Sequence, residues 1–108
     1  MPITRSFRNT IMDRARKDPE FRQQMLTVAI TTLLAGDLNA GKAALRDYVN
    51  ATITFERLSK TVNKPSKSLH RMLGPNGNPQ AESIFGIIKA LQEYEQVQLH
   101  VEASKSAA

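Results

Sequence analysis

Apolar residues recur at helical spacing along most of the chain. Phe7, Ile11 and Ala15 follow an i, i+4, i+8 pattern among several arginines, which predicts a short basic amphipathic helix over about residues 4–17. Such a helix could form an arm that reaches phosphates. The alternative interpretation is a solvated helix that packs on the domain through Phe7 and Ile11.

Two longer helices are expected next. Asp18 as N-cap and Pro19 at the first position begin a helix that runs to about residue 35, where Gly36 provides a left-handed C-cap. Asp37 can cap the following helix, over about residues 38–51. The wide apolar face of the first helix should be buried on more than one side. The expected core side chains of the two helices are Phe21, Met25, Leu26, Val28, Ala29, Ile30, Leu33, Leu34, Leu45, Tyr48 and Val49.

Residues 54–73, TFERLSKTVNKPSKSLHRML, predict two short helices joined by a tight turn. Thr54 is a candidate N-cap, Asn63 tolerates the left-handed conformation that the turn needs, and Pro65 suits the first turn of the second helix. The pattern places one apolar side against the core and one hydrogen-bonding side outward. A compact pair of this kind is what docking into the major groove of DNA requires.

The remaining chain begins with a turn system, GPNGNP, over residues 74–79. Asn78 as N-cap and Pro79 at the first position then predict a last helix, whose apolar stripe is Ile84, Ile87, Ile88 and Leu91, with Phe85 beside it.

Beyond that helix, Val97, Leu99 and Val101 alternate with polar residues, which predicts a short strand that would pair with a second copy or another protein. The alternative is a frayed extension of the helix. Residues 104–108 are expected to be a disordered tail.

The predicted fold is therefore all-α, a small helical bundle with a helix-turn-helix. Its expected organisation is a basic N-terminal helix or arm (1–17), a helical domain (18–94) with the helix-turn-helix at 54–73, and a strand and tail (95–108).

Composition narrows the function. The 108 residues carry a net charge of +5 and no cysteine, which excludes disulfides, cysteine-based zinc sites and thiol nucleophiles. Residues 54–73 hold five Lys or Arg against one acid, whereas residues 80–102 hold one Lys against four Glu. Such polarity favours a phosphate-binding face at the helix pair, although a basic helix hairpin without a ligand is the alternative. No apolar segment is long enough to span a membrane, and the N-terminus lacks the apolar core of a signal peptide. We therefore expect a cytoplasmic protein without membrane contact.

Catalytic chemistry finds little support. The Gly74–Gly77 stretch lacks the spacing of a phosphate-binding loop, and His70 and His100 have no third metal ligand in view. Ser66 or Ser68 beside His70 lacks an acid to orient the imidazole. We therefore expect no enzyme activity, no cofactor and no metal.

The segment FERLSKTVNKPSKSLHRMLGPNGNP, followed by an apolar helix and a short extended segment, resembles the helix-turn-helix antitoxins of bacterial addiction modules, the HigA-like branch of the phage-repressor superfamily. The N-terminal stretch DPEFRQQMLTVAITTLLAGDLNAGKAALRDYV is also similar to the addiction-module antidote proteins. The resemblance implies a dimeric repressor that binds its own operator and neutralises a ribonuclease-like toxin. Two residues depart from the family pattern: Asn63 where glycine is frequent and Lys64 where an apolar residue is usual.

The leading hypothesis is sequence-specific binding of double-stranded DNA by a homodimer. The expected DNA-binding residues are Ser66, Lys67, Ser68, His70 and Arg71 on the second helix, with Lys60 and Lys64 on the phosphate backbone. The resemblance implies that the buried positions of the family's helix-turn-helix match Leu58, Ser59, Val62, Leu69 and Met72 here. Its base-reading positions match Ser66, Lys67, His70 and Arg71.

The dimer interface is expected at the last helix, through Ile84, Phe85 and Ile88, or at the 97–101 segment. Two rival functions remain. One is a protein-interaction module that neutralises a toxin through the 19–35 helix or the C-terminal strand, with DNA binding secondary. The other is an orphan phage-type repressor.

Overall fold

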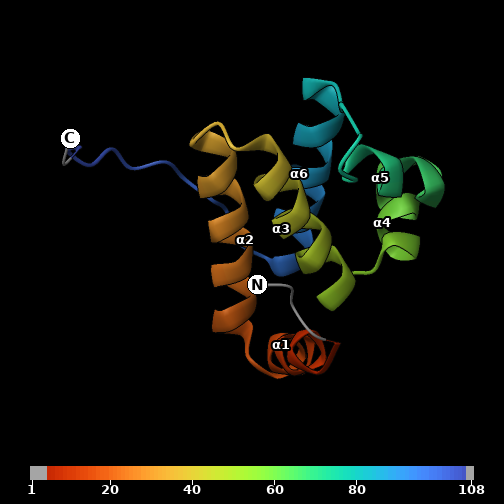
Figure 1. Cartoon of the computed structure of the whole chain (residues 1–108), viewed down its shortest axis with the longest axis horizontal. Helices are drawn as coiled ribbons and strands as arrows, with labels where there is room; N and C mark the ends of the chain where they lie inside the picture. The colour runs from red at the N-terminus through yellow and green to blue at the C-terminus, as the bar shows by residue number, and fades with distance from the viewer. Residues whose placement is uncertain (1–4, 107–108) are drawn as a thin grey trace.

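The computed structural model of the chain describes residues 5–106, and within them six helices enclose one apolar core. The helices are α1 (Arg5–Lys17), α2 (Pro19–Leu34), α3 (Leu38–Ala51), α4 (Phe55–Val62), α5 (Ser66–Met72) and α6 (Ala81–Glu95) (Figure 1). No strand occurs in this part of the chain, so the predicted all-α bundle is confirmed.

Residues 1–4 of the predicted N-terminal arm and residues 107–108 of the predicted tail lie outside the described residues. None of the helices within residues 5–106 has the length and apolar character needed to cross a membrane.

The starts of α2 and α3 are fixed by carboxylate caps, as predicted. Asp18 Oδ1 accepts a hydrogen bond from the Phe21 N–H at 3.2 Å, and Asp37 Oδ1 accepts one from the Ala40 N–H at 3.1 Å. Each bond satisfies a backbone donor that the first turn of a helix leaves unpaired. Gly36, with a φ of +88°, turns the chain between the two helices.

Helices α2 and α3 lie side by side and supply much of the core. Leu26 and Ala29 of α2 and Leu45, Tyr48 and Val49 of α3 are fully buried. The close approach depends on Gly41 of α3, because a Cβ there would collide with the side chain of Leu33. The predicted core of the two helices is confirmed at these positions.

The outer part of the α2 face was predicted wrongly. We expected Val28 and Leu34 to be buried, but their residues are 55% and 66% exposed. The reason is that α3 and α1, which make the main contacts with α2, cover only part of its wide apolar face and leave these two residues in solvent.

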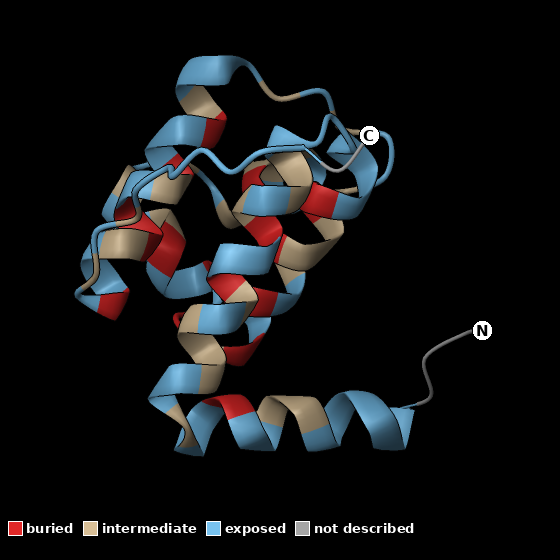
Figure 2. Cartoon of the chain, turned by 90° about the vertical axis from the view of Figure 1, so that its left-hand side faces the viewer, coloured by how far each residue is buried: buried red, intermediate tan, exposed pale blue. Residues whose placement is uncertain are grey.

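Helix α1 lies across the base of the bundle and is mostly exposed (Figure 2). Ala15 is buried and Ile11 is half-buried, whereas Phe7 is 55% exposed. The contact with α2 and α3 therefore comes mainly from the second half of α1.

The beginning of α6 differs from the prediction. The helix starts at Ala81 with Gln80 in the N-cap position, and no side chain caps it, so the expected roles of Asn78 and Pro79 are wrong by two residues. The chain from Gly74 to Pro79 instead wraps the end of α5, which delays the start of α6. The stripe is confirmed, since Ile84, Ile87 and Leu91 are buried.

The end of α6 excludes one of the two interpretations of the following segment, the frayed helical extension, and leaves pairing with a second copy as a prediction. Gln96 adopts a left-handed conformation with a φ of 59°, which stops the helix, so residues 97–101 are not a helical extension. They form no strand within the described chain either, because no second strand lies beside them. We call residues 97–106 the C-terminal arm. Its first part is held to α6 by the Leu99 N–H, which donates to Gln92 Oε1 at 2.8 Å.

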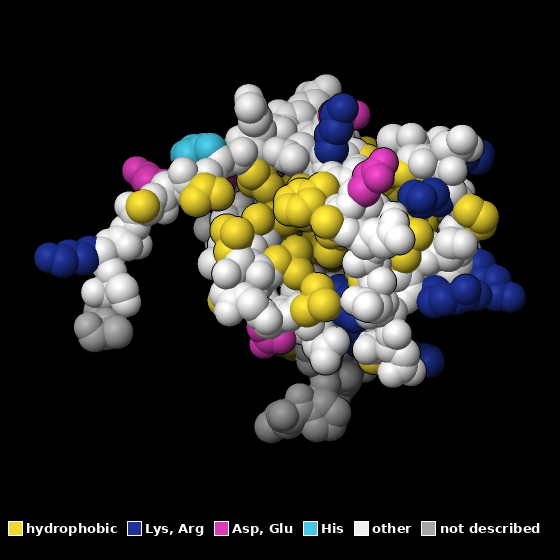
Figure 3. Space-filling model, turned by 90° about the horizontal axis from the view of Figure 1, so that it is seen from above, with side chains coloured by type: hydrophobic (Ala, Val, Ile, Leu, Met, Phe, Trp, Pro, Cys, Tyr) yellow, Lys and Arg dark blue, Asp and Glu magenta, His cyan; other side chains and the backbone are white. Residues whose placement is uncertain are grey.

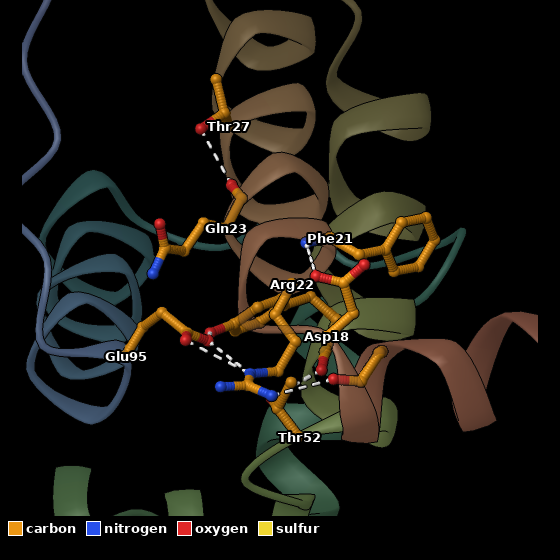
Figure 4. Close-up of polar contacts among 9 residues, drawn as sticks. Asp18, Phe21, Arg22, Gln23, Thr27, Thr52 and Glu95 are labelled. Carbon is orange, nitrogen blue, oxygen red and sulfur yellow. Dashed lines mark hydrogen bonds and ion pairs between the residues drawn. The ribbon is translucent and has the colours of Figure 1, made fainter.

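A charged network closes the base of the core. Glu95 of α6 is only 3% exposed in its side chain and accepts from Arg22 Nε of α2 at 3.1 Å and 3.2 Å (Figure 4). The Tyr48 hydroxyl donates to the same carboxylate at 2.5 Å. Arg22 also donates to the Ala15 carbonyl at 3.0 Å, which joins α1 to the network. Four helices are thus connected through one buried carboxylate.

Replacing Arg22 by methionine should destabilise the fold strongly, because the Glu95 carboxylate would stay buried without its cation. We expect a loss of about 3 kcal/mol in the free energy of unfolding, measured by urea denaturation at neutral pH. Arg16→Met is the matched control: Arg16 pairs with Asp13 at the same 3.1 Å, but these side chains are 60% and 65% exposed. That pair should contribute less than about 1 kcal/mol. Equal losses in the two variants would contradict the role given to the network.

The network also predicts a pH dependence. Burial and the hydrogen bond to Glu95 raise the pKa of Tyr48 above its ordinary value of about 10. The unfolded chain therefore releases this proton first as pH rises, so the stabilisation is complete below pH ~10 and is lost above it. The free energy of unfolding, measured by urea denaturation at increasing alkaline pH, should fall faster for the wild type than for Tyr48→Phe. The difference between the two proteins should shrink with a slope that approaches about 1.4 kcal/mol per pH unit. Parallel curves would show that Tyr48 keeps its ordinary pKa.

Candidate nucleic-acid interface

Helices α4 and α5 form a helix-turn-helix pair on one side of the bundle (Figure 1). Thr54 Oγ1 accepts from the Arg57 N–H at 3.4 Å and caps α4 as predicted, with its own φ at 73°. Asn63 takes the predicted left-handed conformation, with φ 55° and ψ 48°, and its N–H donates to the Ser59 carbonyl. Asn63 therefore forms the turn as expected, whereas Pro65 lies at the N-cap of α5, one residue before the first turn in which it was expected.

Helix α5 has one buried face and one exposed face. Leu69 and Leu73, the residue that follows the helix, are fully buried. At about 100° per residue, Lys67, His70 and Arg71 share the opposite face, and all three are exposed. We call Lys67, His70 and Arg71 the reading face. A short rigid helix thus presents two cations and an imidazole to solvent side by side.

The two predicted serines lie at the edges of this face. Ser66 and Ser68 are each half-buried, one on either side of the reading face. No hydrogen bond joins either serine to His70 within the described chain. Both hydroxyls are placed to contact a phosphate or a base edge beside the reading face.

His70 is held by an aromatic contact that the sequence did not reveal. Its ring stacks on Phe55, the first residue of α4, with 3.9 Å between centroids and 26° between ring planes. Stacking occupies a face of the imidazole and leaves the nitrogen atoms at its edge available for hydrogen bonds. Phe55 itself is buried, so the contact restrains the exposed His70 ring against a residue of the core.

The two predicted phosphate contacts occupy different places. Lys60 on α4 is exposed, whereas Lys64 in the turn is half-buried. Lys64 borders a groove of about 510 Å³ between the turn and α6, which Glu82 and Lys89 also line. The position where the family pattern has an apolar residue is therefore a partly covered lysine at the border with α6.

The cations of this pair are not neutralised within the chain. In residues 5–106 no ion pair involves Lys60, Lys64, Lys67 or Arg71. The fifth cation of the segment, Arg57, lies over the Tyr94 ring at 5.7 Å. Four positive charges on and beside α5 therefore remain available to an anionic partner.

Two cations from α3 hold the end of α5, and the sequence pattern did not predict them. Lys42 is 1% exposed, and its Nζ donates to the carbonyls of Gly74 at 3.0 Å and Gly77 at 2.6 Å. Arg46 donates to the Leu73 carbonyl at 2.6 Å. Carbonyls at a helix C-terminus lack intrahelical partners and carry partial negative charge, so cations there stabilise the helix.

A signal for Lys42 was present in the sequence. Lys42, Leu45 and Val49 follow an i, i+3, i+7 spacing, so the lysine is in phase with the buried stripe of α3. A cation on an apolar stripe indicates a buried ammonium with internal acceptors. The pattern alone does not say which carbonyls accept.

The described residues contain no cluster of three or more His, Cys, Asp or Glu side chains able to hold a metal ion. Comparisons of the chain with protein-family models, with characterised proteins and with solved structures found no match.

The loop that follows α5 has a strict steric requirement at Gly77. A Cβ at this position would collide with the Arg71 carbonyl oxygen and lie 2.6 Å from that of Met72. Gly77→Ala should therefore cost about 1–3 kcal/mol of unfolding free energy, measured by urea denaturation.

Gly86→Ala is the control, because a Cβ at Gly86 in α6 meets nothing within 4 Å. This exchange within a helix should stabilise the protein by about 0.5–1 kcal/mol. A neutral Gly77→Ala would mean that the loop does not pack on α5 as described.

Proposed function

We propose that this protein is a sequence-specific regulator of transcription that binds double-stranded DNA through α5. The observation that supports the proposal most is the reading face. Lys67, His70 and Arg71 project from a helix whose other side is locked into the core. Their cationic groups have no ion-pair partner among residues 5–106.

The reading face suits base recognition in the major groove. Arg71 can donate two hydrogen bonds to O6 and N7 of guanine, and Lys67 can donate to the same acceptors on a neighbouring base. His70, fixed by Phe55, presents a nitrogen at its ring edge to a base or a phosphate. Ser66 and Ser68 flank these contacts. Lys60 and Lys64 lie to one side and bind the phosphate backbone, which positions the helix without reading sequence.

A single α5 contacts too few base pairs for selectivity, so the regulator acts as a homodimer on two half-sites about 34–36 Å apart or a multiple of that distance. In this proposal the protein works in the cytoplasm and carries out no catalysis.

The resemblance of residues 55–79, and of the helices before them, to addiction-module antidotes extends the proposal. The chain would be the antitoxin of a toxin–antitoxin module, repressing its own operon and binding a toxin protein.

Loss of Arg71 and loss of Lys60 should affect DNA binding in different ways. With an operator selected from random duplexes, Arg71→Ala should weaken binding by about 1–3 kcal/mol and relax preference at one base pair per half-site. Lys60→Ala should weaken all sequences alike and reduce the slope of log K against log salt by about 1 for each phosphate that the variant no longer binds. Fluorescence anisotropy over a range of salt concentrations measures both quantities.

Two variants serve as controls for this experiment. Arg71→Lys keeps the charge but loses the planar pair of donors, so it should lose base preference while keeping non-specific affinity. Lys105→Ala, in the C-terminal arm, should bind as the wild type does. The proposal would be refuted by an Arg71→Ala variant that binds the selected operator with unchanged affinity and base preference.

A further inference from the structure

An apolar groove lies on the molecule away from the reading face. It has a volume of about 490 Å³ and is lined by three segments: α2 with Ile30 and Leu34, α6 with Phe85 and Ile88, and the C-terminal arm with Leu99 and Val101. Figure 3 shows hydrophobic side chains gathered at the centre and left of the view, while most Lys and Arg side chains lie at the right, on the side of α4 and α5. We call this surface the α2–α6 groove.

The groove brings several exposed apolar side chains together in one place. Leu34, Phe85 and Val101 are 66%, 66% and 77% exposed, although all three line the same hollow. Clustered exposure of large apolar residues marks an interaction surface, whereas single exposed residues do not. The lining contains no Lys or Arg, so a nucleic acid does not fit this surface.

The C-terminal arm shows what kind of segment the groove accepts. Val97 and Leu99 of the arm are half-buried and pack on the core beside α6, so alternate apolar residues of an irregular segment already cover one part of this face. Val101 continues the same alternation but is mostly exposed, and the last part of the arm extends away from the helices (Figure 1). The groove is therefore only half covered by its own chain.

The hydrogen-bonding groups of the arm's backbone are also partly unused. Beyond the Leu99 N–H, no hydrogen bond within the described chain involves the backbone of residues 100–103. An unpaired extended segment is a ready template for a second one. At about 3.3 Å per residue, residues 100–106 reach about 23 Å, enough to cross onto a neighbouring molecule.

We propose that the occupant of the α2–α6 groove is the C-terminal arm of a second copy of this chain. In a two-fold pair each molecule supplies one groove and one arm, so Val101 of each copy packs on Leu34 and Phe85 of the other. Such a self-complementary contact closes on itself, as two-fold interfaces do. The two arms run antiparallel, and their backbone groups between residues 100 and 103 bond to one another.

This interface combines the two that were expected from the sequence, the last helix and the 97–101 segment. Of the three α6 residues expected to form it, Ile84 is buried in the single chain, whereas Ile88, which is half-buried, and Phe85 line the groove. The choice of a second copy as the occupant rests on the proposed function, which needs two recognition helices. The surface itself rests on exposure and geometry alone.

Sedimentation equilibrium of the full chain tests the interface without DNA. The wild type should be a dimer at micromolar concentration. Val101→Asp and Phe85→Asp should each raise the dimer dissociation constant by about 100-fold, tenfold for each of the two symmetry-related contacts. Both positions are exposed, so circular dichroism should show unchanged helix content.

Val28→Asp is the matched control, because Val28 is also an exposed apolar residue of α2, at 55%, but lies outside the groove. It should remain dimeric. A wild-type monomer, or a Val101→Asp variant that still dimerises like the wild type, would overturn the proposed interface.

DNA titration separates this result from the proposed function. A dimer that depends on Val101 but binds no selected duplex supports the interface and refutes the DNA-binding function. A monomer that still binds a single half-site through Arg71 supports the DNA-binding function and refutes the interface.

Discussion

The ammonium group of Lys42, buried in α3, holds the end of the helix that carries the proposed reading face. Helix α5 has only seven residues, too few to be stable in isolation, so its helicity must come from tertiary contacts. Leu69 and Leu73 anchor one side of it in the core. Lys42 and Arg46 bind the carbonyls that follow its last turn. Burying the Lys42 ammonium without carbonyl acceptors would be costly, so α3, α5 and the 74–77 loop stabilise one another.

This arrangement gives the bundle two surfaces with different chemistry. The α4–α5 side is cationic and rich in hydrogen-bond donors, and α5 is held there by its buried residues Leu69 and Leu73 and by the bonds of Lys42 and Arg46 to the carbonyls that follow it. The α2–α6 groove is apolar and contains no cation. The network around Glu95 joins α1, α2, α3 and α6 through Arg22 and Tyr48 at the base of the bundle. A regulator that reads DNA on one side and dimerises on another requires this separation.

Local signals predicted most of the fold, because they act through neighbours in sequence. The caps at Asp18 and Asp37 and the left-handed turn at Asn63 formed as the residue types require. The reading face followed from spacing alone, and its DNA contacts stay a prediction. The buried polar contacts could not be predicted, because they join residues that are distant in the sequence. Glu95 and Lys42 lie in phase with apolar stripes, but nothing local identifies Arg22 or the carbonyls of the 74–77 loop as their partners.

Nuclear magnetic resonance tests most directly whether α5 contacts DNA. A uniformly ¹⁵N-labelled chain is titrated with its selected operator duplex, and the amide signals are followed residue by residue. If α5 enters the major groove, the largest shifts fall on residues 66–71, with smaller ones at Lys60 and Lys64 and little change along α2. Large shifts confined to α1 or the α2–α6 groove, with α5 unaffected, would contradict the proposed function.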